Sequence, residues 1–285
     1  GPGTLDTAYT DAVMRAWKAR DWAWSIEGLS MHQYTWVAWP PSYASIGFGE
    51  REYATLVKDT LKMEDMIRIH SAVMDKYDPD KKVPLVIDEW GVWLQKLPGS
   101  RDGFLQQQNS IRDAIIASIN LNMFARHADR VRMAAIAQMV NVLQAMILTD
   151  GAKMVLTPTY HLFRMYVPFQ DARRLPITFD AGTYRFGDVV LPRVDAIAAR
   201  GTDGKLWIAL TNVDPGRPVT IDVRIDAARV RAATGTVLTA DRVDAINSYD
   251  RPDTVVPRPI AARVHQGRIA ITLPPKSVTV LSAAE

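Results

Sequence analysis

Cysteine is absent from this 285-residue chain, which therefore holds no disulfide, thiol nucleophile or thiolate metal site. A large excess of one charge is lacking as well: 34 basic and 31 acidic side chains leave a formal charge of +3, and no block of like charges occurs. Nucleic acid and anionic membranes are not expected partners, since both require a concentrated basic face. No apolar run approaches the ~18 residues of a membrane-spanning helix. The five histidines show no metal-ligand spacing such as HExxH, so no metal is expected.

The first part of the chain alternates between helical and strand patterns. Hydrophobic spacing predicts helices over 6–20, 50–77, 104–125 and 157–165, and strands over 26–34, 83–87 and 131–137. Two of these strands, 83–87 and 131–137, are apolar enough to be buried on both faces, as in parallel sheets covered by helices. Such a run of βα units is typical of a doubly wound sheet or of part of a (β/α)8 barrel. No glycine-rich phosphate turn follows the strands, so a nucleotide-binding fold has no support.

The composition changes at about residue 175. Short apolar runs such as KLWIALTNV, VTIDVRI and SVTVLS are separated from there on by Gly-Thr-Asp-Gly, Asp-Pro-Gly and Pro-Pro turns. Strands at this spacing are typical of an antiparallel sandwich. We therefore predict an α/β domain over 1–172 and an all-β sandwich, jelly-roll-like, over 173–285.

The tract 35–49, TWVAWPPSYASIGFG, is rich in tryptophan, proline and glycine. This composition predicts a shaped surface loop rather than a strand or helix. Exposed aromatic side chains in loops are common where ligands bind, although the same residues could pack beneath the loop.

Two acidic residues, Asp88 and Glu89, end the strand pattern of 83–87. Adjacent strand residues point to opposite sides, so the two are not expected to act together on one bond. If Leu85 and Ile87 fill a barrel interior, Glu89 continues their row to the carboxyl end of the strand and Asp88 turns towards the helices. Barrel enzymes place catalytic groups at that end. The alternative is a carboxylate that caps the next turn.

The preceding strand pattern carries Ser30, His32 and Tyr34 on one face, so His32 and Tyr34 could project beside Glu89. A tyrosine hydroxyl suits a carboxylate nucleophile, because its hydrogen bond orients the oxygen and keeps it ionised. The alternative is that Tyr34 is a buried structural residue whose hydroxyl is hydrogen-bonded within the protein. Trp93 offers a flat apolar face of the kind on which sugars stack, yet tryptophan also fills cores.

Three amide side chains, Gln138, Asn141 and Gln144, follow the last strand of the first part. Amides in a loop bind hydroxyl groups or cap the backbone, and their loop position favours a function. A carboxylate, a tyrosine, tryptophans and amides without metal ligands together resemble a sugar-binding cleft.

Longer motifs carry a specific resemblance. The sequences IDEWGVW, HSAVMDKYDP and GFLQQQNSIRDA, and the stretch from RHADRVRM to TPTYHLF, are similar to α-L-arabinofuranosidases of glycoside hydrolase family 51. The likeness runs through roughly residues 24–170. It implies a (β/α)8 barrel followed by a β-sandwich, and removal of terminal arabinofuranosyl groups from arabinoxylan or arabinan with retention of configuration. It implies no cofactor.

The resemblance also assigns roles by motif. Glu89 in DEW matches the nucleophile at the end of the seventh barrel strand, and Tyr34 in HQYT matches the tyrosine of the sixth strand. His32 would line the same pocket and Trp93 would flank the sugar. Gln144 is the predicted amide for arabinose hydroxyls, with Gln138 and Asn141 as close competitors.

One expected motif is missing. Retaining hydrolysis needs two carboxyl groups about 5–5.5 Å apart, and the family's acid/base follows an asparagine in a Gly-Asn-Glu phrase that does not occur here. The residues 1–3 resemble the loop after the fifth barrel strand. We therefore expect about strands 6–8 of a barrel, with the N-terminal half and the acid/base supplied by a separate chain or an upstream segment. An open remnant would expose strand edges.

The expected partners are arabinose-containing oligosaccharides and the N-terminal barrel half. The resemblance implies a homo- or hetero-oligomer, with a hexamer as the common size. Two alternatives stay open: a non-catalytic carbohydrate-binding or assembly subunit, and a related retaining barrel hydrolase acting on β-xylosides or β-glucans. Linkage preference, exo or endo action and localisation also stay open.

Overall fold

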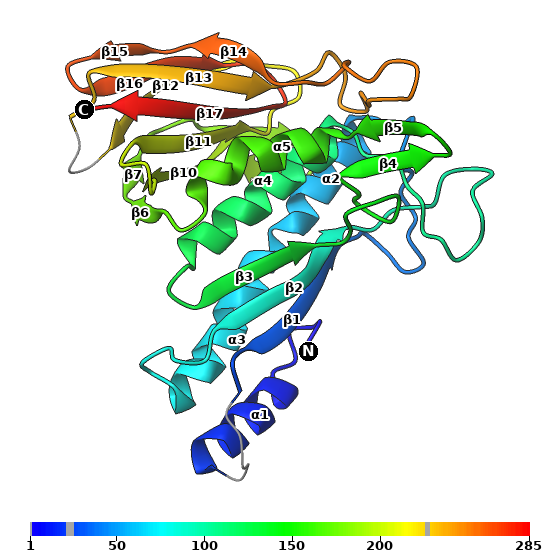
Figure 1. Ribbon diagram of the computed structural model, residues 1–285, viewed down its shortest axis with the longest axis vertical. Helices are drawn as coiled ribbons and strands as arrows, with labels where there is room; N and C mark the ends of the chain where they lie inside the picture. The colour runs from blue at the N-terminus through cyan, green and yellow to red at the C-terminus, as the bar shows by residue number, and fades with distance from the viewer. Residues whose placement is uncertain (1, 21–25, 226–228) are drawn as a thin grey trace.

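The computed structural model describes residues 2–20, 26–225 and 229–285. Gly1 and residues 21–25, which belong to the predicted first domain, lie outside the described residues. Figure 1 shows helices around a small parallel sheet in the lower part and a set of antiparallel strands above it. The predicted change of architecture is confirmed in this coarse form: a mixed α/β part precedes an antiparallel β-sandwich.

The first part contains the helices α1 (Ala8–Ala19), α2 (Glu50–Thr60), α3 (Lys62–Tyr77), α4 (Ile111–Arg126) and α5 (Pro158–Tyr166), the last followed by a 3-10 turn (Val167–Phe169). Its strands are β1 (Leu29–Thr35), β2 (Leu85–Val92), β3 (Val131–Ile136), β4 (Ile147–Asp150) and β5 (Lys153–Leu156). The helix predicted over 50–77 is two helices joined at Leu61.

The helix predicted from 104 begins only at Ile111. There the backbone N–H of Ser110 donates to Asp113 Oδ2 at 2.6 Å, which caps the helix start. The hairpin of β4 and β5 was not predicted.

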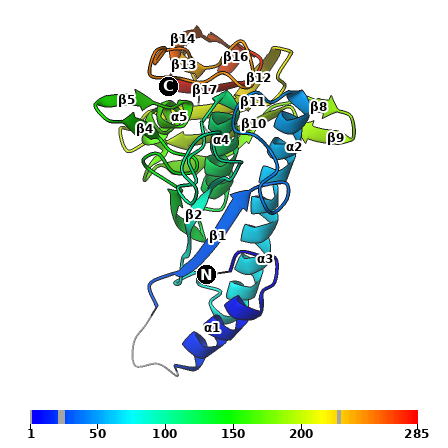
Figure 2. The same cartoon turned by 90° about the vertical axis from the view of Figure 1, so that its right-hand side faces the viewer.

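The strands β1, β2 and β3 form a parallel sheet in that order. One face carries Met31, Leu85 and Ile87, which are fully buried in the same core as residues of α2, α3 and α4. Figure 2 shows α2 and α3 running alongside this sheet. The N-terminal residues lie along β1, because the N–H of His32 donates to the backbone oxygen of Pro2 at 3.0 Å.

The prediction that 131–137 is buried on both faces is wrong. In β3 the side chains of Arg132 and Met133 are exposed, Met133 by 58%. The reason is that β3 is an edge strand, which pairs with β2 on one side only in the described part of the chain.

A β-bulge in β2 decides which side chains face away from the helices. Ser30 to His32 in β1 is matched by Val86 to Glu89 in β2, so β2 carries one residue more over the same distance. The pairing of β2 with β3 shifts at the same place. A bulge breaks the strict alternation of a strand, so consecutive side chains can lie on one side.

The predicted row of Leu85, Ile87 and Glu89 is therefore wrong. Leu85 and Ile87 pack against the helices, and Trp90 returns to that core, with its ring 5.2 Å from that of Phe124. Glu89 instead lies on the opposite side of the sheet, where its carboxylate meets the side chain of His32.

The second part is a sandwich of two antiparallel sheets. Its strands are β6 (Arg173–Leu175), β7 (Ile177–Thr178), β10 (Val194–Arg200), β11 (Leu206–Asn212), β12 (Val219–Ile225), β13 (Ala232–Leu238), β14 (Arg258–Ala261), β15 (Arg263–His265), β16 (Arg268–Leu273) and β17 (Ser277–Ala284). Six strands form the sheet β14-β13-β17-β11-β10-β6 and four form β15-β16-β12-β7, with a core of their own between them. The side chains of β12 alternate strictly between buried and exposed, as expected for a sheet with one solvated face.

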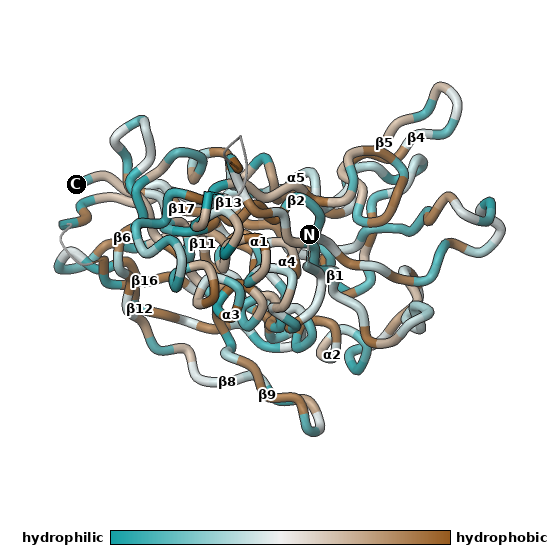
Figure 3. Tube along the Cα trace, turned by 90° about the horizontal axis from the view of Figure 1, so that it is seen from below, coloured by the Kyte–Doolittle hydropathy of each residue, from teal (hydrophilic) through white to brown (hydrophobic). Residues whose placement is uncertain are grey.

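Two further strands, β8 (Thr183–Phe186) and β9 (Val189–Pro192), form a separate hairpin that is not part of either sandwich sheet. Figure 3 shows this hairpin and that of β4 and β5 projecting from the body of the molecule. The hydroxyl of Tyr184 donates to Glu50 Oε1 at 2.9 Å and so ties the hairpin to the start of α2.

The helix α4 joins the two parts. The hydroxyls of Ser118 and Thr211 lie 2.9 Å apart, and Asn122 and Arg126 donate to the carboxylate of Asp195 at 2.7 and 2.8 Å. Burial raises the pKa of Asp195 despite these donors. No helix in the described part of the chain is long and apolar enough to cross a membrane.

Candidate active site

The loops that follow β1, β2 and β3 gather at one end of the parallel sheet, on the right in Figure 1. They comprise residues 36–49, 93–110 and 137–146. Because carboxyl ends of parallel strands meet at one edge, side chains from all three loops can surround a common site there.

The carboxylate of Glu89 has a protein partner on each oxygen. The hydroxyl of Tyr34 donates to Oε1 at 2.5 Å, and Nδ1 of His32 lies 3.1 Å from Oε2. The Glu89 side chain is nonetheless 41% exposed. The structure thus brings together the three residues that the sequence pattern placed at this strand end, with the carboxylate oriented and still open to a ligand.

Tyr34 remains a donor at any working pH. Burial, followed by the hydrogen bond to Glu89, raises its pKa far above the ordinary value for a phenol. The hydroxyl therefore keeps its proton, and the bond to the carboxylate persists.

Asp88 is also part of this cluster, contrary to the prediction that it turns towards the helices. The hydroxyl of Ser30 donates to Asp88 Oδ1 at 2.7 Å, and Nε2 of His32 lies 3.2 Å from the same oxygen. The bulge explains the difference, because it puts Asp88 and Glu89 on one side of the sheet. The imidazole of His32 consequently lies between two carboxylates.

Aromatic rings continue from Tyr34 to the surface. Trp93 packs edge-on against Tyr34 with ring centroids 5.0 Å apart, and Trp36 and Trp39 pack against Trp93 at 5.9 and 5.3 Å. Trp39 is 64% exposed. The tract 35–49 is the surface loop that its composition predicted, with aromatic side chains both packed and exposed.

Gln144 lies beside the end of β2, but its amide is enclosed by the protein, and its predicted role in sugar binding is wrong. Its side chain is fully buried. Its oxygen accepts from the backbone N–H of Val92 at 2.9 Å, and its nitrogen donates to the backbone oxygen of Asp113 at 2.8 Å and to Thr159 Oγ1 at 3.3 Å. An amide whose groups are used inside the protein has none to offer a ligand.

The two competing amides differ from each other. Asn141 exchanges hydrogen bonds with Thr149, donating to Oγ1 at 2.9 Å and accepting from its N–H at 2.7 Å, so it braces the β4 strand. Gln138 directly follows the carboxyl end of β3 and is exposed. The backbone N–H of its neighbour Ala137 donates to Trp90 at 2.8 Å, which sets Gln138 next to the strand that carries Glu89.

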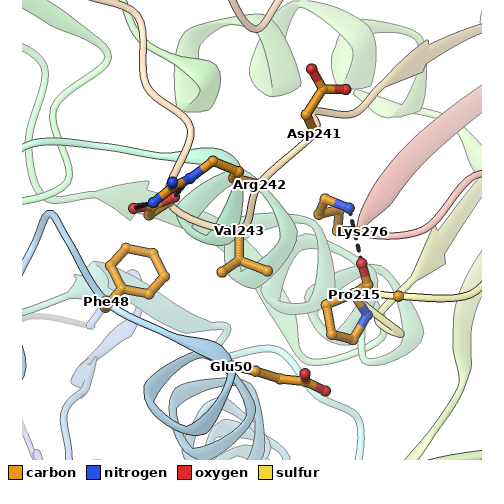
Figure 4. A pocket seen from close by; sticks show the side chains of 9 residues that line it. Phe48, Glu50, Pro215, Asp241, Arg242, Val243 and Lys276 are labelled. Carbon is orange, nitrogen blue, oxygen red and sulfur yellow. Dashed lines mark hydrogen bonds and ion pairs between the residues drawn. The ribbon is translucent and has the colours of Figure 1, made fainter.

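A hollow of about 270 Å³ lies elsewhere, between the start of α2 and loops of the sandwich (Figure 4). Several of its charged side chains are engaged within the protein: Lys276 donates to the backbone oxygen of Pro215 at 2.9 Å, and Arg242 pairs with Asp244 at 2.7 Å. No group of three or more His, Cys, Asp or Glu side chains suited to a metal ion occurs in the residues that the structure describes.

Comparison with known proteins defines the family of this chain. The model of the α-L-arabinofuranosidase C-terminal domain matches residues 88–277. An intracellular exo-α-L-arabinofuranosidase of Bacteroides ovatus is 39% identical over 99% of this chain and 54% of its own length.

Solved structures extend the likeness. The GH51 arabinofuranosidase from Xanthomonas axonopodis pv. citri superposes with a TM-score of 0.96 at 47% identity, covering 100% of this chain and 57% of that protein. The α-L-arabinofuranosidase of Thermotoga maritima, at 23% identity and a TM-score of 0.74, shares the fold over 98% of this chain and 56% of its own. The chain belongs to the α-L-arabinofuranosidases of glycoside hydrolase family 51, as part of their C-terminal portion. It spans about half the length of the relatives it matches.

Proposed function

We propose that this chain, completed by the N-terminal half of the barrel, is a retaining exo-α-L-arabinofuranosidase in which Glu89 is the nucleophile. The observation that carries the proposal is the Glu89 carboxylate, held by Tyr34 and His32 and open to solvent at the end of a parallel sheet. The exo-α-L-arabinofuranosidase of Bacteroides ovatus, which matches nearly the whole chain, supports the substrate class.

The proposal includes the assignment of the parallel sheet to a (β/α)8 barrel. β1, β2 and β3 correspond to barrel strands 6–8, with the boundary to the sandwich at 172/173, just before β6. In support, β3 pairs on one side only among the described residues, and the lining of a hollow of about 580 Å³ beside it includes Leu121, Phe124, Met133, Phe163 and Phe169. A strand and helix from the missing half would cover this apolar surface and complete the sheet.

In the completed barrel, Glu89 attacks the anomeric carbon of a terminal arabinofuranoside. A glutamic acid from the missing half protonates the departing glycosidic oxygen, and a covalent glycosyl-enzyme forms. The same residue, now a carboxylate, takes a proton from water, which displaces Glu89 and releases arabinose. Two successive inversions at one carbon retain the configuration.

The neighbouring side chains have separate roles. Tyr34 and His32 fix the direction of the attacking oxygen, and Trp93 provides an apolar wall beside it. Gln138, rather than Gln144, offers an amide to the sugar hydroxyls, because it is exposed at the end of β3.

The test uses this chain co-purified with the N-terminal half, and arabinose release from an aryl α-L-arabinofuranoside. Glu89→Ala should abolish turnover, and added azide should restore it with formation of the inverted glycosyl azide, since a small anion can occupy the vacated position. Glu27→Gln, at an exposed carboxylate before β1, serves as the control and should keep full activity. Retained activity in Glu89→Ala would remove Glu89 from the nucleophile role.

The isolated chain separates this proposal from that of a non-catalytic carbohydrate-binding or assembly subunit. Without the second carboxyl group it should be inactive, and activity should appear on addition of the N-terminal half. Turnover by the purified chain alone would show that the acid/base lies within it. Absence of turnover even in the complete assembly would favour the non-catalytic subunit.

A further inference from the structure

We propose that Trp39 is a binding platform for the leaving side of the substrate, where it stacks on a pyranose ring next to the bond that is cut. The inference rests on the proposed function and adds a subsite and the class of sugar it accepts. A terminal arabinose attached to a backbone of pyranose units, as in arabinoxylan, is the substrate type that such a platform selects.

The first observation is the place of Trp39 at the end of a series of ring contacts. Its ring is 5.3 Å from that of Trp93, which in turn is 5.0 Å from that of Tyr34, the residue bonded to Glu89. Two ring contacts separate the exposed indole from the carboxylate's partner. This separation is of the order of one sugar residue beyond the arabinose that Glu89 would attack.

The second observation is the exposure of Trp39 despite its ring contacts. Trp39 is 64% exposed, although it packs against Trp36 at 5.2 Å and against Trp93. Leaving a large apolar ring in water is unfavourable, whereas burying one of its faces against a ligand gains apolar contact.

The third observation is that the loop carrying Trp39 is fixed at several points. Before it, the N–H of Trp36 donates to the buried Asp59 at 3.0 Å. After it, the oxygen of Tyr43 accepts from the N–H of Gln95 at 2.9 Å, and the guanidinium of Arg112 lies 3.8 Å from the centre of the Phe48 ring. A fixed platform loses little conformational entropy when a ligand binds.

The shape of the sugar decides which unit fits. A β-linked xylopyranose has equatorial hydroxyls, so both of its broad faces consist of C–H groups that match a flat indole. A furanose ring is smaller and puckered, and offers less flat apolar surface. The face of Trp39 therefore suits a xylose of the backbone better than a second arabinose.

The experiment compares substrates with and without that ring in the completed enzyme. The probes are α-L-arabinofuranosyl fluoride, which has no ring on its leaving side, an arabinose-substituted xylotriose, and an α-1,5-linked arabinotriose. The variants are Trp39→Ala and Trp39→Phe. Tyr9→Ala is the control, because it removes another exposed aromatic ring. Tyr9 is on α1, which lies at the bottom of Figure 1, away from the loops on the right.

In Trp39→Ala, kcat/KM for the xylotriose substrate should fall about tenfold, equivalent to about 1.4 kcal/mol. Hydrolysis of the fluoride and of arabinotriose should stay within about twofold of the wild type. Trp39→Phe should lose less, since it keeps a flat face, and Tyr9→Ala should leave all three substrates unchanged.

Other outcomes overturn the inference. An equal loss on the fluoride would mean that Trp39 supports the protein, or contacts the missing barrel half, instead of a sugar. A matching loss on arabinotriose would refute selectivity for pyranose. If Trp39→Ala leaves the ratio of kcat/KM for the xylotriose substrate to kcat/KM for the fluoride unchanged, the binding platform is refuted but the proposed function is not. A wild-type enzyme that does not hydrolyse the fluoride would refute both.

Discussion

Replacing Gln144 by alanine is expected to destabilise the protein rather than to weaken sugar binding directly. The side chain connects three segments, because it bonds to the backbone of Val92 at the end of β2, to the backbone of Asp113 in α4 and to Thr159 in α5. All of these residues are fully buried. The substitution therefore removes hydrogen bonds where water has little access.

The magnitude follows from the partners left behind. The N–H of Val92 and the oxygen of Asp113 would each lose a partner at 2.9 and 2.8 Å. A buried polar group without a partner costs about 1–3 kcal/mol, so we expect a loss of roughly 2–6 kcal/mol for the pair. Gln144→Met retains most of the volume and isolates the hydrogen-bond contribution from that of the cavity.

Urea unfolding followed by tryptophan fluorescence measures the difference in the free energy of unfolding. Gln95→Ala, at an exposed glutamine in the loop after β2, is the matched control and should change stability by less than about 0.5 kcal/mol. If Gln144→Ala loses less than about 1 kcal/mol while the affinity for arabinose falls, the buried amide is not structural and the reasoning is refuted.

Three further outcomes are expected. Gly91→Ala should lower the melting temperature, because its φ of +150° suits glycine and a Cβ would lie 3.2 Å from the backbone oxygen of Ala137; an unchanged melting temperature would contradict this. In the completed enzyme, Tyr34→Phe should lower kcat by about 10–100-fold with little change in KM, since a hydrogen bond to a charged group contributes about 1.5–3 kcal/mol; a change in KM alone would assign Tyr34 to substrate binding. For Asp78, burial raises the pKa, but two backbone amides and a guanidinium outweigh it and hold the pKa below 3.8. The ionised Asp78 therefore stabilises the fold above the unfolded-state pKa, and this stabilisation is lost as pH falls through the folded-state pKa. The difference in the free energy of unfolding between the wild type and Asp78→Asn should decrease as the pH is lowered.

Much of the parallel sheet and of the candidate site follows from the sequence. Apolar runs indicated β2 and β3, and the period of two in β1 placed His32 and Tyr34 on one face beside Glu89. These inferences succeed because they depend on local periodicity and on the rule that parallel strands end together.

The bulge and the choice among the amides could not be predicted in this way. An extra residue in β2 is defined only by the register of its neighbours, and the same letters in an unbulged strand would send Asp88 to the other side. Gln138 and Gln144 both follow β3 in a loop, and only the packing of α4 and α5 shows that one of them is buried. The sequence did offer one signal. Asp88 and Glu89 follow each other at a strand end beside a strand with Ser30 and His32, a pattern that could have indicated that both carboxylates contact His32.

The open edge of β3 has a similar origin. The sequence of β3 is apolar, yet β3 is an edge strand in the described part of the chain and Met133 is exposed there. Apolar composition alone does not tell an edge strand from a central one.

The bonds from α4 into the sandwich bear on how the chain can be divided. Ser118, Asn122 and Arg126 use partners that lie after residue 172, so a chain truncated there would leave polar groups of a central helix without them. The sandwich thus stabilises α4, the helix that packs against β2 and β3 of the parallel sheet. Substitutions at Asp195, on β10, should loosen α4 and with it the strand that carries Glu89, although they touch no sugar.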